Sequence, residues 1–280
     1  MAPLDTRPLP EELLLLCAEP VRGRLRIPQS AFYWAVPGSV LAELQLGGAI
    51  TVDGRRITGF QPLGSHDEIA AGVLARLEET GKRKHRLGLD LAMRRIPRKP
   101  TQQLFLDRLT AEGVLTVDRR SFLGLPYRRY TAVPPGIGQE IAARVAATLA
   151  ADDAGPAPTA SPVAAAASSA PSADVAAAPA DAPPAAGGEA SDAAGTSTDA
   201  ADGDRQPADQ DGRSAAQDRQ TADRDRQLAG LIYAAGLHRR LYPGPAGAPT
   251  RRAARRLANE LPVPRAVRRA ISAMSASTAS

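Results

Sequence analysis

The sequence PEELLLL, Pro10 to Leu16, is the stretch that decides the fold. A proline followed by Glu11 and Glu12 is typical of a helix start. Proline fits the first helical turn, and acidic side chains favour the positive end of the helix dipole. The apolar run from Leu13 to Cys17 predicts the buried body of that helix. We therefore expect this helix to belong to a mainly helical fold.

The residues that follow predict a second helix and a β-hairpin. Pro37 is expected to open the helix, with Val40, Leu41 and Leu44 as its apolar side. Gly47-Gly48 would close it. Two strand-like runs then flank the dipeptide Asp53-Gly54, which is a strong hairpin signal; they are 49–53 and 55–58.

Further helices and a second hairpin are expected before residue 150. Ser65 and Glu68 have the spacing of a capping box, and Gly81 would end the helix that they start. A fourth helix is predicted from about Thr101 to Glu112. The second hairpin follows, turning at Arg119-Arg120, and a further helix covers 137–149.

Residues 151–222 differ from the rest in composition. They contain mostly Ala, Pro, Ser, Asp, Gly and Thr, which cannot bury enough apolar surface to offset the ordering entropy. We predict a disordered acidic linker there. Residues 1–150, before it, are expected to form the N-terminal part of a helical domain. In the segment 223–280, the two short basic helices are too small to hold a core alone. The expected helix from Arg224 to Leu241 and these two helices should complete the same domain.

The charge distribution favours an anionic partner. The net charge of +5 includes a segment, 151–225, with 4 Lys/Arg against 14 Asp/Glu, so the remaining parts are strongly basic. Such a surface suits lipid headgroups or nucleic acid. The single cysteine excludes a disulfide framework, and no run resembles a signal peptide or a membrane span. The expected place is the cytoplasm of a bacterium, peripheral on the inner face of the membrane.

Four runs in this order resemble the Golgi phosphoprotein family. They are PEELLLL (10–16), GSVLAELQLGGAITVD (38–53), DRLTAEGVLT (107–116) and LAGLIYAAG (228–236). The resemblance implies a mostly helical domain that binds phosphatidylinositol 4-phosphate on membranes. It also implies membrane-protein cargo and oligomer contacts through the second hairpin.

The family's headgroup pocket uses one tryptophan and three arginines. The tryptophan position falls near Pro28 here, whereas the only tryptophan is Trp34. The arginine positions are occupied by Pro37, Lys99 and Gln102, of which only Lys99 is positively charged.

Two clusters are predicted to contact the lipid. The first combines Trp34 with the basic run Arg94, Arg95, Arg98 and Lys99, where each charge near an anionic leaflet contributes about 1 kcal/mol. The second is the hairpin, where apolar, tyrosine and arginine side chains form a mixture found at membrane interfaces. Its arginines are Arg128 and Arg129, and its membrane-contact or oligomer residues are Phe122, Leu123, Leu125, Tyr127 and Tyr130. Ordinary core packing stays an alternative for Trp34, Phe122 and Leu125.

Catalysis finds little support in the sequence. The three histidines are isolated, no metal-ligand spacing or phosphate loop is present, and no cofactor is expected. The alternative function is a winged-helix-like DNA-binding protein. In that case Arg119, Arg120, Arg128 and Arg129 would hold phosphates beside the helix at 101–112.

Overall fold

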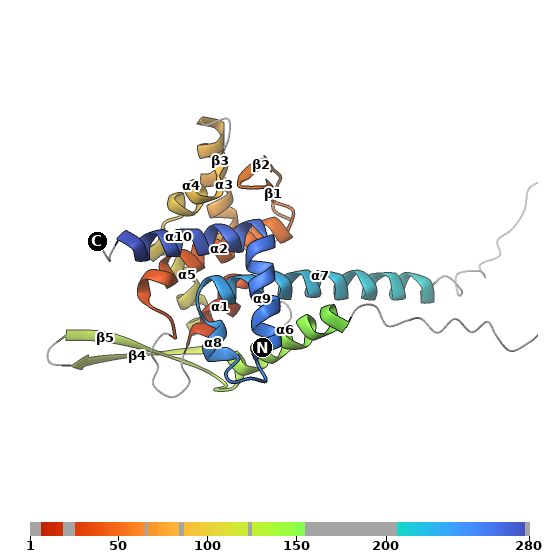
Figure 1. Cartoon of the computed structure of the whole chain (residues 1–280). Helices are drawn as coiled ribbons and strands as arrows, with labels where there is room; N and C mark the ends of the chain where they lie inside the picture. Colours follow the sequence, from red (N-terminus) through yellow and green to blue (C-terminus); the bar gives the residue numbers. More distant parts are fainter. Residues whose placement is uncertain are drawn as a thin grey trace, which may run out of the picture. The chain divides into compact units, whose positions relative to one another are not determined.

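The computed structural model describes residues 7–18, 26–64, 67–83, 87–122, 125–154 and 206–277. Within these ranges, helices dominate and two small antiparallel sheets accompany them (Figure 1). The helices are α1 (Leu9–Cys17), α2 (Gln29–Leu46), α3 (Glu68–Arg83), α4 (Leu89–Arg95), α5 (Arg98–Ala111), α6 (Ile137–Ala154), α7 (Gln206–Ala234), α8 (His238–Leu241), α9 (Ala248–Glu260) and α10 (Pro262–Ser277). The expectation of a mainly helical domain with two β-hairpins is confirmed.

Helix α1 lies at the centre of the core. All of its residues are buried, and it packs against α2, α5 and α6. Burial on every side explains why its apolar run has no polar face. Glu11 and Glu12 are also buried, which the sequence did not indicate, because acids near a helix start are usually solvated.

Helix α2 begins eight residues earlier than expected. Pro37 lies inside it and does not open it. The run Ala31 to Val36 is helical because Phe32, Trp34 and Val36 are buried, and this packing outweighs the backbone hydrogen bond that an internal proline removes. At Gly38, an added Cβ would lie 2.1 Å from Val267 of α10, so α2 and α10 approach closely there.

The first sheet contains β1 (Ile50–Asp53), β2 (Arg56–Phe60) and a short third strand, β3 (Leu87–Gly88). The hairpin at Asp53-Gly54 is as expected, with Gly54 at φ 55°. Helix α3 is capped by Asp67, whose carboxylate accepts hydrogen bonds from the N–H groups of Ile69 and Ala70. Ser65 of the expected capping box lies outside the described residues. Helix α3 also continues through Gly81, where an added Cβ would lie 2.8 Å from Phe60.

The second sheet pairs β4 (Leu115–Phe122) with β5 (Leu125–Ala132). The expected turn at Arg119-Arg120 is wrong, because both residues lie within β4 and pair with Arg128 and Tyr127. Two arginines have no preference for a turn conformation, whereas continuing the strands keeps the backbone hydrogen bonds. Leu123 and Gly124, between the two strands in the sequence, lie outside the described residues.

Residues up to 155 and from 214 onward form one compact unit. Helices α9 and α10 pack on each other, α9 on α6 and α10 on α2. Helix α7 begins at Gln206, well before the expected Arg224, and α6 reaches Ala154. Ala, Gln and Arg extend a helix at little cost once its packed end has formed. The rest of the predicted disordered linker, 155–205, lies outside the described residues.

Candidate anion-binding site

Trp34 is covered by two arginine side chains. The indole is 8% exposed, and the guanidinium carbon of Arg98 lies 4.2 Å from the ring centroid. That of Arg94 lies 5.9 Å away. A cation over an indole face is attracted by the ring quadrupole, and the attraction grows as the pair is desolvated. The tryptophan therefore holds two positive charges at one place.

The break between α4 and α5 brings these two arginines together. Pro97 disfavours a helical conformation at Ile96, so α4 ends there and α5 begins at Arg98. Ala92, Met93 and Ile96 are buried and fix the break against the core. Arg94 consequently lies in the last turn of one helix and Arg98 in the first turn of the next, both beside α2.

A cavity of about 550 Å³ opens beside this pair. Helix α10 forms its other wall and contributes Arg269 together with Ala270, Ala273, Met274 and Ser277. One acidic residue lines the cavity, Asp90, and it is paired at its rim with Arg55 at 3.1 Å. Positive charge is therefore in excess on the walls.

Three of the cavity's arginines have no carboxylate partner among the described residues: Arg94, Arg98 and Arg269. The Nε atoms of Arg98 and Arg269 are buried without a hydrogen-bond acceptor. A buried donor without an acceptor costs free energy, which an oxyanion in the cavity would offset. Planar guanidinium groups also match the oxygen geometry of phosphate and carboxylate. The cavity is therefore suited to a phosphate-like group.

Lys99 and Arg95 lie in different surroundings. Lys99 lines a neighbouring hollow of about 370 Å³ that shares Arg94 and Arg98 and includes Tyr33. Arg95 lines a separate hollow of about 230 Å³ with Arg76, Glu79, Thr80 and Arg83. The structure therefore brings Trp34, Arg94 and Arg98 together, with Lys99 beside them and Arg95 apart.

The hairpin residues are only partly described. Arg129 and Tyr130 are half-buried, and Tyr130 packs against the core. In the strand register, Arg129 lies opposite Asp118, and Tyr130 lies opposite Val117. Leu123 lies outside the described residues, as do the side chains of Phe122, Leu125, Tyr127 and Arg128. Membrane contact or oligomer contact by these residues stays a prediction.

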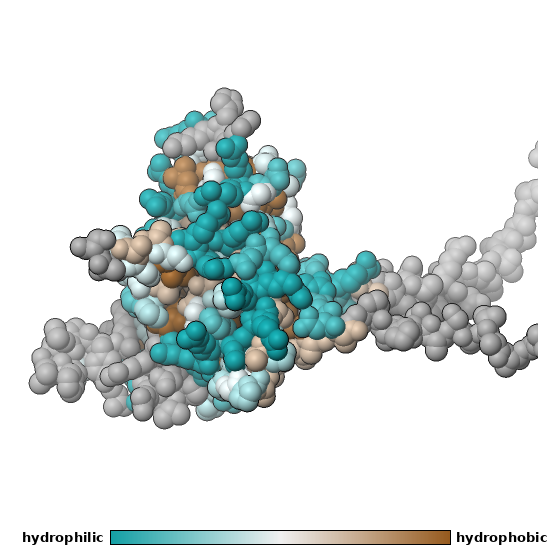
Figure 2. Space-filling view, viewed as in Figure 1, coloured by the Kyte–Doolittle hydropathy of each residue, from teal (hydrophilic) through white to brown (hydrophobic). Residues whose placement is uncertain are grey.

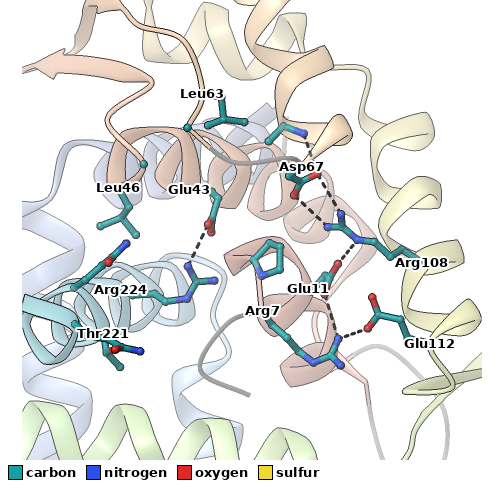
Figure 3. A pocket seen from close by; sticks show the side chains of 16 residues that line it. Arg7, Glu11, Glu43, Leu46, Leu63, Asp67, Arg108, Glu112, Thr221 and Arg224 are labelled. Atoms are coloured by element: carbon teal, nitrogen blue, oxygen red, sulfur yellow. Dashed lines mark hydrogen bonds and ion pairs between the residues drawn. The ribbon is translucent and has the colours of Figure 1, made fainter. Parts of the chain in front are cut away.

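A larger cavity, of about 690 Å³, has arginines of a different kind (Figure 3). Arg7 pairs with Glu112 at 2.7 Å, and Arg224 pairs with Glu43 at 3.1 Å. Arg108 bonds both Glu11 and Asp67, and it reaches Asp67 at 3.1 Å. Every arginine that lines this cavity has a carboxylate partner, although the Nε atoms of Arg7 and Arg224 are also buried without an acceptor. The positive charge is therefore compensated within the fold here, unlike the charge beside Trp34.

A second ion-pair cluster joins α1 to α6 and α7. Arg144 of α6 contacts both carboxylate oxygens of Glu12, at 3.0 and 2.9 Å, and donates to Asp225 of α7 at 2.9 Å. Thr148 donates a further hydrogen bond to Asp225 at 2.8 Å. Burial raises the pKa of Glu12 to about 7, although Arg144 opposes that rise. These carboxylates tie α1, α6 and α7 together, which is a structural role.

Two side chains with catalytic potential lie in the described residues, Cys17 and His238. Cys17 is fully buried, and burial raises its pKa to about 12, so it is not a thiolate near neutral pH. His238 stacks on Tyr233 with ring centroids 4.4 Å apart. Within the described ranges, no group of three His, Cys, Asp or Glu side chains could hold a metal ion. None of the described helices is long and apolar enough to span a bilayer.

Comparison with known protein families gives a match over residues 9–274 to the model described as Golgi phosphoprotein 3 (GPP34). The chain belongs to this family. No individual curated protein matches the chain.

The resemblance assigned the family's pocket residues to Pro28, Pro37, Lys99 and Gln102, and this assignment stays a prediction. Pro28 precedes α2, Pro37 is buried inside α2, and Gln102 is half-buried on α5. The described cavity instead combines Trp34, six residues after the expected position, with arginines from α4, α5 and α10. Arg269 was missed by the sequence analysis, because no local pattern links it to Trp34. The spacing of Arg94 and Arg98 around a helix-breaking proline was the available signal.

Proposed function

We propose that this member of the family is a peripheral membrane adaptor that recognises anionic lipid headgroups, with the headgroup held in the cavity beside Trp34. The observation that carries the proposal is that Arg94, Arg98 and Arg269 line one cavity together with Trp34, and none of the three has a carboxylate partner in the described structure. Arginine recognises phosphate oxygens by paired hydrogen bonds, which suits a phosphorylated headgroup. Family membership supports phosphatidylinositol 4-phosphate as the first lipid to test.

The same proposal includes a non-catalytic role at the inner face of the bacterial membrane. The buried thiol of Cys17 and the stacked ring of His238 support it. Membrane-protein cargo and self-association through β4 and β5 belong to the proposal by family resemblance.

The experiment is sedimentation with vesicles at near-physiological salt, with phosphatidylcholine alone, with added phosphatidylglycerol, or with added phosphatidylinositol 4-phosphate. Wild-type protein should pellet with the anionic vesicles. Arg98→Gln should weaken that binding by roughly tenfold, because a charge-assisted hydrogen bond to phosphate contributes about 1.5–3 kcal/mol. Trp34 is the only tryptophan, so its fluorescence reports on the cavity directly.

Arg95→Gln is the matched control. It removes the same charge three residues away, but from a side chain that lines another hollow. Binding should change by less than about threefold. Equal losses in the two variants would show that only net charge matters, and the headgroup assignment would fail.

The same sedimentation experiment tests DNA binding when duplex DNA is added as a competitor of the vesicles. The described residues of α5 give it little support. Gln103 bonds Asp107 at 2.6 Å, and Arg108 is occupied by Glu11 and Asp67. Strong competition by DNA would favour the winged-helix alternative.

A further inference from the structure

The last three helices present a second basic surface outside the cavity. Between residues 238 and 277 the chain has nine arginines and one acidic residue, Glu260. Five of these arginines are exposed and have no carboxylate partner in the described structure. We call them the basic face: Arg239, Arg240, Arg252, Arg255 and Arg265. Figure 2 shows hydrophilic side chains gathered over α9 and the adjoining part of α10.

The other four arginines differ from the basic face because each has a partner or lines the cavity. Arg256 pairs with Asp153 at 3.0 Å, and Arg251 donates to the carbonyls of Tyr242 and Gly244. Arg268 donates to Asn259, and Arg269 belongs to the cavity. Interactions within the fold therefore account for Arg251, Arg256 and Arg268, and the cavity accounts for Arg269. In the basic face, Arg252 and Arg265 donate to the backbone carbonyls of Ala248 and Glu260 at 3.4 Å, and both side chains stay exposed with their charge uncompensated by a carboxylate in the described structure.

The apolar sides of α9 and α10 are already used. Ala254 and Leu257 of α9 are buried, as are Val263 and Val267 of α10. The large apolar side chains exposed in the described residues, Leu104 and Val133, lie on neither helix. A helix that inserts into a bilayer exposes large apolar residues, so this surface fits contact with the headgroup layer by charge alone.

The basic face adjoins the headgroup cavity along α10. Arg265, Arg269, Ala273 and Ser277 are spaced by four residues, so they follow one side of that helix. The last three line the cavity, and Arg265 lies one turn before them. An anionic surface that supplies a headgroup to the cavity would therefore lie near the start of the basic face.

We propose that the basic face is a second contact with the same anionic bilayer, one that senses charge density without selecting a headgroup. The inference rests on the proposed function. In this inference the cavity and the basic face have different roles. The cavity gives headgroup preference, and the basic face gives affinity for anionic lipid in general, which falls with salt because exposed charges are screened.

The test is the double variant Arg252→Gln/Arg255→Gln, which removes two charges from one exposed side of α9. Binding to phosphatidylglycerol vesicles should weaken on the order of thirtyfold, since each charge near the leaflet contributes about fivefold. The preference for phosphatidylinositol 4-phosphate vesicles over phosphatidylglycerol vesicles should be kept. Arg98→Gln should reduce that preference. Thermal melts should be unchanged, because both side chains are exposed.

The matched control is Arg76→Gln/Lys82→Gln, which removes two exposed charges from α3. It should bind within about threefold of wild type. Equal losses in the two double variants would overturn the inference, because binding would then follow net charge. Wild-type affinity in Arg252→Gln/Arg255→Gln would also overturn it and would leave the proposed function standing.

Two further outcomes separate the remaining cases. If wild-type protein ignores every vesicle, the proposed function fails, and the inference fails with it. If the double variant loses duplex DNA binding while its vesicle binding is unchanged, the basic face is a nucleic-acid surface, and the bilayer contact is wrong.

Discussion

Arginine has opposite roles in two regions of this molecule. Around α1, Arg108 and Arg144 are partly buried and each contacts two carboxylates. Beside Trp34, Arg94 and Arg98 lie over an aromatic ring and have no acidic partner in the described structure. A buried charge must be compensated, so the first set is explained by the fold itself. Under the proposed function an anion would compensate the second set, and this difference separates a structural cluster from a candidate binding site.

The largest expected effect is a loss of stability when the ion-pair cluster around Arg144 is broken. Arg144→Met would leave Glu12 and Asp225 buried without their cation, at 0% and 1% exposure. We expect unfolding in urea to show a loss of about 3–5 kcal/mol, the usual cost of breaking a buried pair. Arg95→Gln, on the surface, should change stability by less than about 0.5 kcal/mol. A loss below about 1 kcal/mol in Arg144→Met would remove the contrast between the two regions.

The next effect is a dependence of stability on pH. The pKa of Glu12 is raised to about 7 in the folded protein by burial, from 4.5. The folded state therefore binds more protons than the unfolded state between these values, so stability should fall as pH rises from about 4.5 to 7. The fall should not exceed about 3 kcal/mol. Glu12→Gln cannot ionise, so urea titrations across this range should show a shallower slope than wild type; identical slopes would contradict the assignment.

A smaller effect is expected where α2 and α10 approach each other closely. In Gly38→Ala the new Cβ would meet Val267 and push α2 away from α10, which carries Arg269. We expect about 1–3 kcal/mol of destabilisation together with weaker vesicle binding. The second change Val267→Ala should relieve the clash. Gly72→Ala on exposed α3, where the new Cβ meets nothing within 4 Å, should be neutral or slightly stabilising. A stable Gly38→Ala protein with normal binding would contradict the close approach.

The smallest effect on stability should come from the candidate site. Arg98→Gln removes a cation over Trp34, which contributes about 0.5–2 kcal/mol at most. Relief of charge repulsion with Arg94 offsets part of that loss, so the melting temperature should hardly change. Arg98→Lys should bind vesicles at an intermediate level, because it keeps the charge without the planar donor fork. Calorimetry and sedimentation on the same samples would test both, and strong destabilisation would assign Arg98 to the core.

Local sequence patterns predicted which helices and hairpins form better than they predicted where each begins and ends. The apolar run after Pro10, the Asp53-Gly54 turn and the two basic C-terminal helices all depend on neighbouring residues, and all were found. The errors arose where distant packing outweighed a local signal. Burial of Phe32 and Trp34 extends α2 through Pro37, and strand pairing carries β4 past Arg119-Arg120. A residue such as Pro37 carries a local free-energy cost inside a helix. Only the tertiary contacts decide whether packing offsets that cost.

The sequence by itself determined that this protein is mainly helical, basic outside an acidic segment, and related to the Golgi phosphoproteins. These properties follow from composition, periodicity and the order of four runs. Only the tertiary structure decided which arginines are compensated. Arg98 and Arg108 look alike in the sequence, yet one lies over Trp34 and the other bonds Glu11 and Asp67. The physical reason is that the electrostatic role of a charge depends on which groups surround it in space, and those groups come from distant parts of the chain.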